Sequence, residues 1–315
     1  MSRLVSKQSV LLLAAFVFLA LVPGTGSRYY VFLFNEMLIF GLFAISLNLV
    51  LGYTGLVPFG HAAYFGLGAY ACGILIKRVG LDSIMAILGA SVFGGFAALI
   101  IGFFCVRLTK IYFAMLTLAF AQLVWVIVFN WQSLTGGDNG LLGVDFPPYL
   151  NSRESFYYFC LVLVSLCLFV LWRVVHSPFG RILTAIRDNA ERVEFIAINV
   201  RQYQLIAFVI SGIFAATAGA LFAILNHSVF PEYCHWKMST EALIMTLLGG
   251  MYSFFGPMLG ALALIWLKLE TANHTEYWPL IMGGILCALI LFFPSGLAGI
   301  AGSAKRFIES RRVRK

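Results

Sequence analysis

Long apolar runs separated by short polar segments make up almost the whole chain. Many of the runs hold roughly 20 residues, the length with which an α-helix crosses a hydrocarbon core about 30 Å thick. The runs do not alternate apolar and polar positions, and backbone groups in lipid must be paired internally, so helices are predicted rather than barrel strands. The predicted spans cover residues 10–22, 31–51, 56–76, 84–106, 111–131, 156–175, 203–226, 240–269 and 278–293.

The first of these spans resembles a secretory signal peptide, because Arg3 and Lys7 precede a short apolar run. However, the residues after Pro23 contain no clear Ala-x-Ala cleavage site, and another span begins shortly afterwards. We therefore expect an uncleaved first helix.

Two stretches rich in glycine and proline interrupt the predicted spans. The run 240–269 is longer than one crossing needs, and Gly249–Gly250 and Gly256–Pro257 break it. Dividing this run gives about ten transmembrane or partly re-entrant segments and returns the basic C-terminal tail to the side of the N-terminus. A second interruption lies at residues 52–61.

Discontinuous helices of this kind often build a transport pathway, because unwound backbone supplies polar groups inside the membrane. The alternative is that the glycines only allow helices to pack closely, which is the role assigned to Gly66, Ala69 and Gly73. Both interpretations stay open for the two breaks. The candidate pathway residues are Gly52, Tyr53, Thr54, Gly60, His61, Gly249, Gly250 and Gly256.

Composition agrees with a membrane protein. With 61% hydrophobic and 11% charged residues, the chain departs from soluble domains, in which about a quarter of residues are charged. The net charge of +8 does not indicate a nucleic-acid partner, since six Lys and Arg residues crowd positions 305–315 and predict a cytoplasmic membrane anchor. The six cysteines show no metal-ligand spacing and are assigned to packing.

The distribution of Lys and Arg predicts the orientation in the membrane. Both termini, the turn at 107–110 and the segment 173–201 are basic and are expected in the cytoplasm, whereas the loop 132–155 carries mainly acids and is expected outside. Lys77 and Arg78 then fall outside, against the rule.

The segment 173–201 holds five arginines and three acids between long uncharged runs. Ser177 suits a helix cap and Pro178 a first helical position. Charged residues of both signs, including an i,i+4 pair of Asp188 and Arg192, lie off an apolar stripe. Mixed signs favour docking into a groove on another protein, because helices that lie on a bilayer carry mostly Lys and Arg. The stripe consists of Phe179, Leu183, Ile186, Ala190, Val193 and Ala197.

The sequence does not indicate catalysis or ion coupling. From the second span onward, the spans are expected to be free of Asp, Glu, Lys and Arg away from their ends, which argues against proton- or sodium-coupled transport. His61 is the one deep ionisable group and is interpreted as packed rather than as a proton relay. GxSxG, HExxH and GxxxxGK[ST] motifs are absent, so an enzyme is not indicated and any ATP must be bound by another polypeptide.

Five blocks, in order, resemble the permease subunits of branched-chain amino acid ABC importers, in particular the LivM type. The likeness covers nearly the whole chain after residue 35. The blocks are NLVLGYTGLVPFGHAAYFGLGAYA, LTGGDNGL at 134–141, SPFGRILTAIRDNAERVEFIAINVRQYQLIAFVISGIFAATAGALFA, LGGMYSFFGPMLGA at 248–261 and FPSGL at 293–297.

The resemblance implies an all-α polytopic permease in the plasma (inner) membrane of a bacterium or archaeon, with both termini cytoplasmic. A single transmembrane domain would cover 1–315, with a coupling segment at 176–202 and a basic tail at 303–315. The implied function is import of branched-chain, hydrophobic amino acids. The implied partners are a second permease of the LivH type, two ATPase subunits that bind ATP and Mg, and a periplasmic substrate-binding protein. This chain would hold no cofactor.

The helix at 181–199 would then be the coupling helix, seated in a groove of one ATPase. The chain departs from the family pattern at Ala190, Val193 and Ala197, where Glu, Ala and Gly are expected, and these changes affect the detailed fit to the ATPase. The implied coupling residues are Arg181, Arg187, Asp188, Asn189, Glu191, Arg192 and Glu194.

Two kinds of alternative stay open. Related permeases serve urea, short amides or aromatic acids, and the binding protein largely sets the selectivity. A different class, an ATP-independent channel or facilitator, would show the same spans without needing a mixed-charge docking helix. Such a channel would be purified without a stoichiometric ATPase.

Overall fold

The computed structural model describes residues 28–108, 110–144 and 152–274, with isolated positions at 19, 23, 280, 283–284, 287 and 296–299. Its longer helices are α2 (Arg28–Thr54), α3 (Ala62–Ile74), α4 (Ser83–Cys105), α5 (Lys110–Asn130), α7 (Arg153–His176), α10 (Val200–Asn226), α11 (Trp236–Gly249) and α12 (Gly256–His274). The shorter elements are a π-helical turn η2 (Leu75–Val79), α6 (Gln132–Thr135), α8 (Pro178–Asp188), α9 (Ala190–Phe195), the 3-10 turns η3 (Gly137–Asn139) and η5 (Pro231–Cys234), and strands β1 (Leu141–Leu142) and β2 (Ser228–Val229). The predicted all-α class is confirmed.

Five helices among the described residues are long and apolar enough to cross a membrane: α2, α4, α5, α7 and α10. They correspond to five of the predicted spans. The predicted spans 10–22 and 278–293 and the basic tail at 303–315 lie outside the described residues, apart from isolated positions.

Two other predicted spans are broken in the structure. The run 240–269 forms two helices, α11 and α12, with a non-helical turn between Gly249 and Gly256, so the predicted division is confirmed. The prediction of a helix over 56–76 is wrong in its first part, because α3 begins only at Ala62. Residues 55–61 are a loop whose apolar side chains are largely packed inside the protein, which gives them the composition of a span without its conformation.

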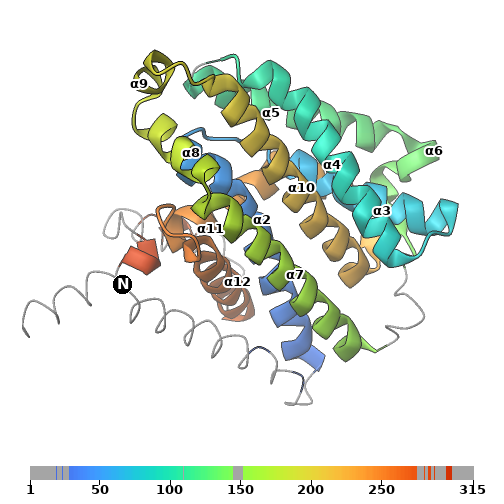
Figure 1. Cartoon of the computed structure of the whole chain (residues 1–315). Coiled ribbons are helices and arrows are strands. Elements are labelled where there is room, and N and C mark those ends of the chain that lie inside the picture. Colours follow the sequence, from blue (N-terminus) through green and yellow to red (C-terminus); the bar gives the residue numbers. More distant parts are fainter. Residues whose placement is uncertain are drawn as a thin grey trace, which may run out of the picture.

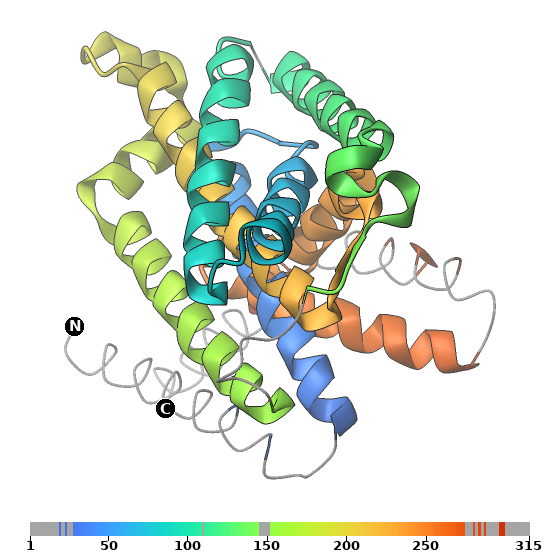
Figure 2. The same ribbon diagram turned by 90° about the vertical axis from the view of Figure 1, so that its right-hand side faces the viewer.

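Helix α2 runs through the middle of the bundle and contacts α7, α10, α11 and α12 (Figures 1 and 2). Almost every residue from Met37 to Thr54 is buried. A helix that is apolar on all sides is stable only where other helices surround it. The central position of α2 therefore follows from its sequence. This position also places the predicted break at residues 52–61 beside several other helices.

Helix α10 packs against α3 and α4 through small residues, as expected for close contacts between membrane helices. Gly212 faces Ala98 of α4, and Gly219 lies against the Phe65 carbonyl of α3. Of the glycines assigned to helix packing, Gly66 lies against Cys234 of η5 and Gly73 against the Leu141 side chain of β1, so both allow a close approach, but not of another long helix.

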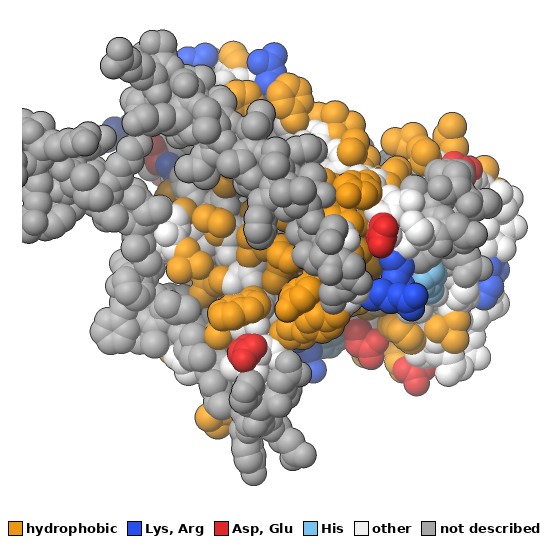
Figure 3. Space-filling view, turned by 90° about the horizontal axis from the view of Figure 1, so that it is seen from below, with side chains coloured by type: hydrophobic (Ala, Val, Ile, Leu, Met, Phe, Trp, Pro, Cys, Tyr) orange, Lys and Arg blue, Asp and Glu red, His pale blue; other side chains and the backbone are white. Residues whose placement is uncertain are grey.

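The outward faces of α4, α5 and α7 are apolar. Large exposed side chains include Phe96 of α4, Ile111 of α5 and Val162 of α7. On the described surface visible in Figure 3, apolar side chains predominate and charged groups occupy a few separate places. Surfaces of this kind fit hydrocarbon or another apolar helix, not water.

One end of the bundle carries a small cap in which β1 and β2 pair antiparallel, Leu141 opposite Val229. Lys77 donates a hydrogen bond to the Leu142 carbonyl at 2.7 Å, and Arg78 donates to the carbonyls of Ser133 and Leu134. These two cations, which oppose the positive-inside rule, thus serve as donors to loop carbonyls. Their presence at this end has a structural reason that is independent of orientation.

Candidate coupling and pathway site

The predicted coupling helix is two short helices in the structure. Asn189 has an extended backbone, with φ −162° and ψ 102°, and separates α8 from α9. Its side-chain Oδ1 accepts a hydrogen bond from the Arg192 amide at 3.0 Å, which caps α9. The prediction of one continuous helix over 181–199 is therefore wrong. Asp188 and Arg192 do not share a helical turn, and the i,i+4 pair predicted from their spacing is not formed.

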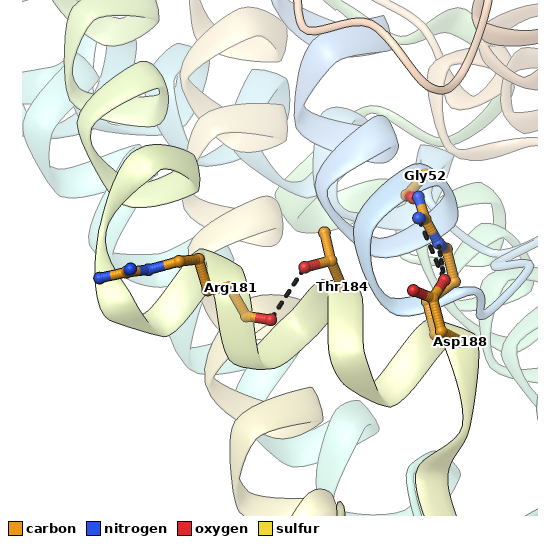
Figure 4. Close-up of polar contacts among 5 residues, drawn as sticks. Gly52, Arg181, Thr184 and Asp188 are labelled. Atoms are coloured by element: carbon orange, nitrogen blue, oxygen red, sulfur yellow. Dashed lines mark hydrogen bonds and ion pairs between the residues drawn. The ribbon is translucent and has the colours of Figure 1, made fainter.

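The start of α8 agrees with the prediction from the sequence except in one hydrogen bond. Pro178 occupies the first turn and Ser177 the cap position, as predicted. The Ser177 hydroxyl does not cap α8, however, because it donates to the Val174 carbonyl of α7 at 2.6 Å. Farther along α8, Thr184 donates to the Arg181 carbonyl at 2.8 Å (Figure 4).

Five of the six residues of the predicted apolar stripe are buried or half-buried. Leu183, Ile186 and Val193 are buried, and the Phe179 ring stacks on that of Tyr203 at 5.6 Å. Ala197 is exposed and has a positive φ of 62°, so the prediction that it continues the stripe is wrong.

At the tip of this segment two large apolar side chains are exposed, Phe195 by 87% and Ile196 by 68%. The sequence analysis missed them because they lie off the stripe. The charged side chains around them, those of Arg181, Asp188, Glu191, Arg192 and Glu194, are also exposed. The segment 176–200 thus presents an apolar tip within a mixed-charge surface.

Arg187 is the one predicted coupling residue whose side chain turns inward to the predicted pathway. Its Nη1 donates to the Gly52 carbonyl at 2.7 Å, and its Nε and Nη2 lie within 3.3 Å of Asp188 Oδ1 (Figure 4). Its guanidinium also lies 5.2 Å from the centre of the Tyr252 ring, in the turn between α11 and α12. The structure therefore joins the coupling segment to both predicted breaks.

The two breaks lie against each other at Gly52. A side chain at this position would collide with the Asn48 amide and the Met251 carbonyl. Asn48 Nδ2 donates to the Ser253 carbonyl at 3.4 Å, so α2 holds the α11–α12 turn by a hydrogen bond as well.

Glycines also allow the backbone segments around this turn to pack closely together. Gly249 packs against the Gly256 carbonyl, and Gly296 packs against Gly250. Four of the predicted pathway residues, Gly52, Gly249, Gly250 and Gly256, are thus neighbours in space.

The other predicted pathway residues make different contacts. Gly60 packs against the Thr117 carbonyl of α5, and the Thr54 hydroxyl donates to the Val50 carbonyl of its own helix. Tyr53 is half-buried beside the group. His61 is fully buried, stacked on Phe43 at 5.3 Å.

The environment of His61 agrees with a packed residue. Its Nε2 lies 3.0 Å from the Ser46 hydroxyl, which itself donates to the Phe43 carbonyl at 2.7 Å. With the single Ser46 hydroxyl hydrogen on the Phe43 carbonyl, Nε2 donates to Ser46 Oγ. No chain of titratable groups continues from His61 among the contacts of the described residues.

Two polar features inside the bundle were not foreseen. Asn48 and Asn35 are 1% exposed, and the Oδ1 atom of each has no hydrogen-bond partner among the described residues. Lys268 of α12 forms an ion pair with Glu241 of α11 at 3.6 Å, and Glu36 of α2 lies close enough to interact with both charges. Glu241 and Lys268 lie at the ends of the predicted run 240–269, where the prediction allowed charges, so only Glu36, inside the predicted span 31–51, departs from it.

The described residues contain no group of His, Cys, Asp and Glu that could hold a metal ion. The described cysteines form no disulfide, and all except Cys287 are buried. The site is thus built from backbone breaks, amides and one arginine.

This bundle of membrane-length helices, broken twice and joined at the breaks to a charged segment, defines a polytopic α-helical membrane permease. The chain belongs to the family described as branched-chain amino acid transport system / permease component, whose model matches residues 29–293. The resemblance drawn from the sequence blocks is thereby confirmed.

Curated relatives come from bacteria and an archaeon. The chain is 29% identical to the high-affinity branched-chain amino acid transport system permease protein LivM of Escherichia coli (strain K12), over 92% of this chain and 75% of that protein. It is 24% identical to a probable LivM permease of Methanocaldococcus jannaschii, over 83% and 91% of the two chains. It is 25% identical to the LivH permease of Escherichia coli (strain K12), over 82% and 91%. No solved structure matches the chain.

Proposed function

We propose that this chain is a permease subunit of an ATP-driven importer that carries branched-chain, hydrophobic amino acids into the cytoplasm. It would act in the inner membrane with a second, LivH-like permease, two ATPase subunits that bind ATP and Mg, and a periplasmic binding protein. Its LivM and LivH relatives support the substrate class and the paired permeases. The observation that carries the proposal is the exposed segment 176–200, which Arg187 connects to both helix breaks.

The segment 176–200 has the features of a surface that docks to a protein. Productive interfaces combine a central apolar contact with a polar rim. Phe195 and Ile196 would supply the apolar contact. The rim would be supplied by Arg181, Asp188, Asn189, Glu191, Arg192 and Glu194.

Replacing Phe195 tests this docking. Phe195→Glu places a charge at the apolar centre and should reduce the amount of ATPase that co-purifies with the permease by about tenfold or more, the effect expected at an interface hot spot. Leu142→Glu is the matched control, because Leu142 is also an exposed apolar residue but lies in the cap. Equal ATPase recovery with both variants would contradict docking at α9.

The pathway for an amino acid would pass the two breaks. A zwitterion needs hydrogen-bond partners for its ammonium and carboxylate groups, while its side chain suits apolar surroundings. Asn48 Oδ1, which has no hydrogen-bond partner among the described residues, and the non-helical backbone from Gly249 to Gly256 are polar groups of this kind. Tyr53, half-buried near the end of α2, would line the path on the α2 side.

The direct test is transport by the assembled importer. The chain would be purified with the second permease, the ATPases and the binding protein that we expect to be encoded beside it. The complex would be placed in liposomes and supplied with labelled leucine, urea or benzoate. We expect leucine uptake that requires ATP. Uptake without ATP would support a channel, and ATP-dependent uptake of urea or benzoate alone would support a different substrate class.

A further inference from the structure

Arg187 contacts its neighbour Asp188 and two segments of the chain outside its own helix. Its guanidinium reaches Gly52 at the end of α2, Asp188 in α8 and the Tyr252 ring in the α11–α12 turn. Its side chain is 27% exposed, whereas that of Asp188 is 71% exposed. The arginine therefore points into the bundle from a segment that otherwise presents its charges outward.

The bond to Gly52 is of a strong kind. Gly52 lies in the last turn of α2, where carbonyls lack helical partners and the helix dipole is negative. A guanidinium that donates to such a carbonyl forms a charge-assisted hydrogen bond. Arg187 thus caps α2 from another part of the chain, 135 residues away.

The neighbouring backbone leaves room for this arginine. Gly55 has a φ of +75°, and a Cβ at this position would lie 3.0 Å from Arg187 Cγ. A side chain at Gly55 would therefore both strain the backbone and press on the arginine. The close passage of Arg187 over the end of α2 depends on this glycine.

Arg187 also lies where α2 and the α11–α12 turn meet. Gly52 packs against the Met251 carbonyl, and Asn48 is hydrogen-bonded to Ser253. A movement of α8 that carries Arg187 with it must either move these two backbones or break the contacts to them. Among the residues that the structure describes, no other side chain of the segment 176–200 forms a hydrogen bond, ion pair or cation–π contact with either break.

We infer that Arg187 is the positioning residue through which movement of the ATPase-docking segment reaches both helix breaks. The inference rests on the proposed function. It adds the residue that links docking of the ATPase to the opening and closing of the pathway between the membrane helices. Arg187 would touch neither ATP nor substrate. Replacing Arg187 should leave the rate of ATP hydrolysis unchanged and lower the amount of substrate transported per ATP hydrolysed.

The test compares variants of the complete importer in liposomes, with ATP hydrolysis and substrate uptake measured on the same preparation. Arg187→Met should lower uptake per ATP hydrolysed about tenfold, the effect of losing one charge-assisted hydrogen bond, while the ATPase rate changes less than about twofold. Arg187→Lys should be intermediate, because an ammonium is a point charge and cannot bind Gly52 and lie over Tyr252 together. Arg173→Met, which removes an exposed arginine from the end of α7, is the matched control.

Tyr252→Leu provides a second variant that keeps the Gly52 bond. It should lower uptake per ATP about two- to fivefold, in line with loss of a cation–π contact. Unchanged uptake per ATP in both Arg187→Met and Tyr252→Leu would overturn the inference, and so would loss of the ATPase subunits from the Arg187→Met complex. A wild-type importer without ATP-driven uptake would instead overturn the proposed function.

Discussion

Ala197 has a side chain that does not suit its backbone. A φ of +62° lies in the left-handed region, where a Cβ costs an L-residue roughly 1 kcal/mol. Ala197→Gly should therefore stabilise the segment by about 0.5–1 kcal/mol. Amide hydrogen exchange of residues 190–200 should become slower in the variant.

The same substitution at Ala185 should have the opposite effect. Ala185 is exposed inside α8, where glycine costs about 0.5–1 kcal/mol in backbone entropy. Exchange of the α8 amides should become faster in Ala185→Gly. If both variants changed exchange in the same direction, backbone strain would not be the cause.

Asn189 shows which residue details a single sequence leaves open. The apolar stripe passes Asn189 without interruption, and asparagine occurs both inside helices and at their N-caps. The periodicity therefore predicted one helix, and the structure has two. Phe195 and Ile196 lie off the predicted stripe, at the end of α9, so a prediction that followed the stripe did not include the exposed tip.

The α11–α12 hairpin depends on glycine at the crossing of its two helices. A Cβ at Gly260 would collide with the Met245 carbonyl and lie 2.7 Å from the Gly249 amide nitrogen. Because backbone cannot rotate away as a side chain can, Gly260→Ala should cost about 2 kcal/mol or more. The variant should lose its monodisperse peak in size-exclusion chromatography after milder heating than the wild type.

Gly89 of α4 supplies the control for this effect. A Cβ there would meet only the Leu75 Cδ1 atom, at 2.8 Å, which is the end of a flexible side chain. Alanine also favours the helix by about 0.5–1 kcal/mol, so Gly89→Ala should be close to neutral. Equal destabilisation by both alanines would show that the Gly260 crossing is not tightly packed.

At the level of elements, hydropathy and glycine position predicted most helices. Runs such as 84–106 and 203–226 became α4 and α10 with small changes in their bounds. The run 56–76 failed because a loop packed inside a membrane protein is as apolar as a helix. Pro58 and Gly60 indicate the non-helical part of this run. The prediction of a pathway relied on them, but the predicted helix still began at residue 56.

At the level of the whole molecule, the decisive contacts join residues far apart in the chain. Arg187 and Gly52 are 135 residues apart, and Asn48 and Ser253 are 205 apart. Sequence periodicity carries no information on such pairs. It predicted a coupling segment and two breaks, and the structure brings Gly52 and the second break together while leaving Gly60 and His61 elsewhere.

The orientation of the protein in the membrane is a prediction. The proposed function requires that the segment 176–200 lie on the cytoplasmic side. The capped end holds Asp138 and the opposite end holds Glu191, both exposed. A membrane-impermeant maleimide should label Asp138→Cys in intact cells and Glu191→Cys only in permeabilised cells. The background chain would carry Cys287→Ala, because the other described cysteines are buried, and it should stay unlabelled. Labelling of Glu191→Cys from outside would place the segment 176–200 away from the cytoplasm, where no ATPase could reach it.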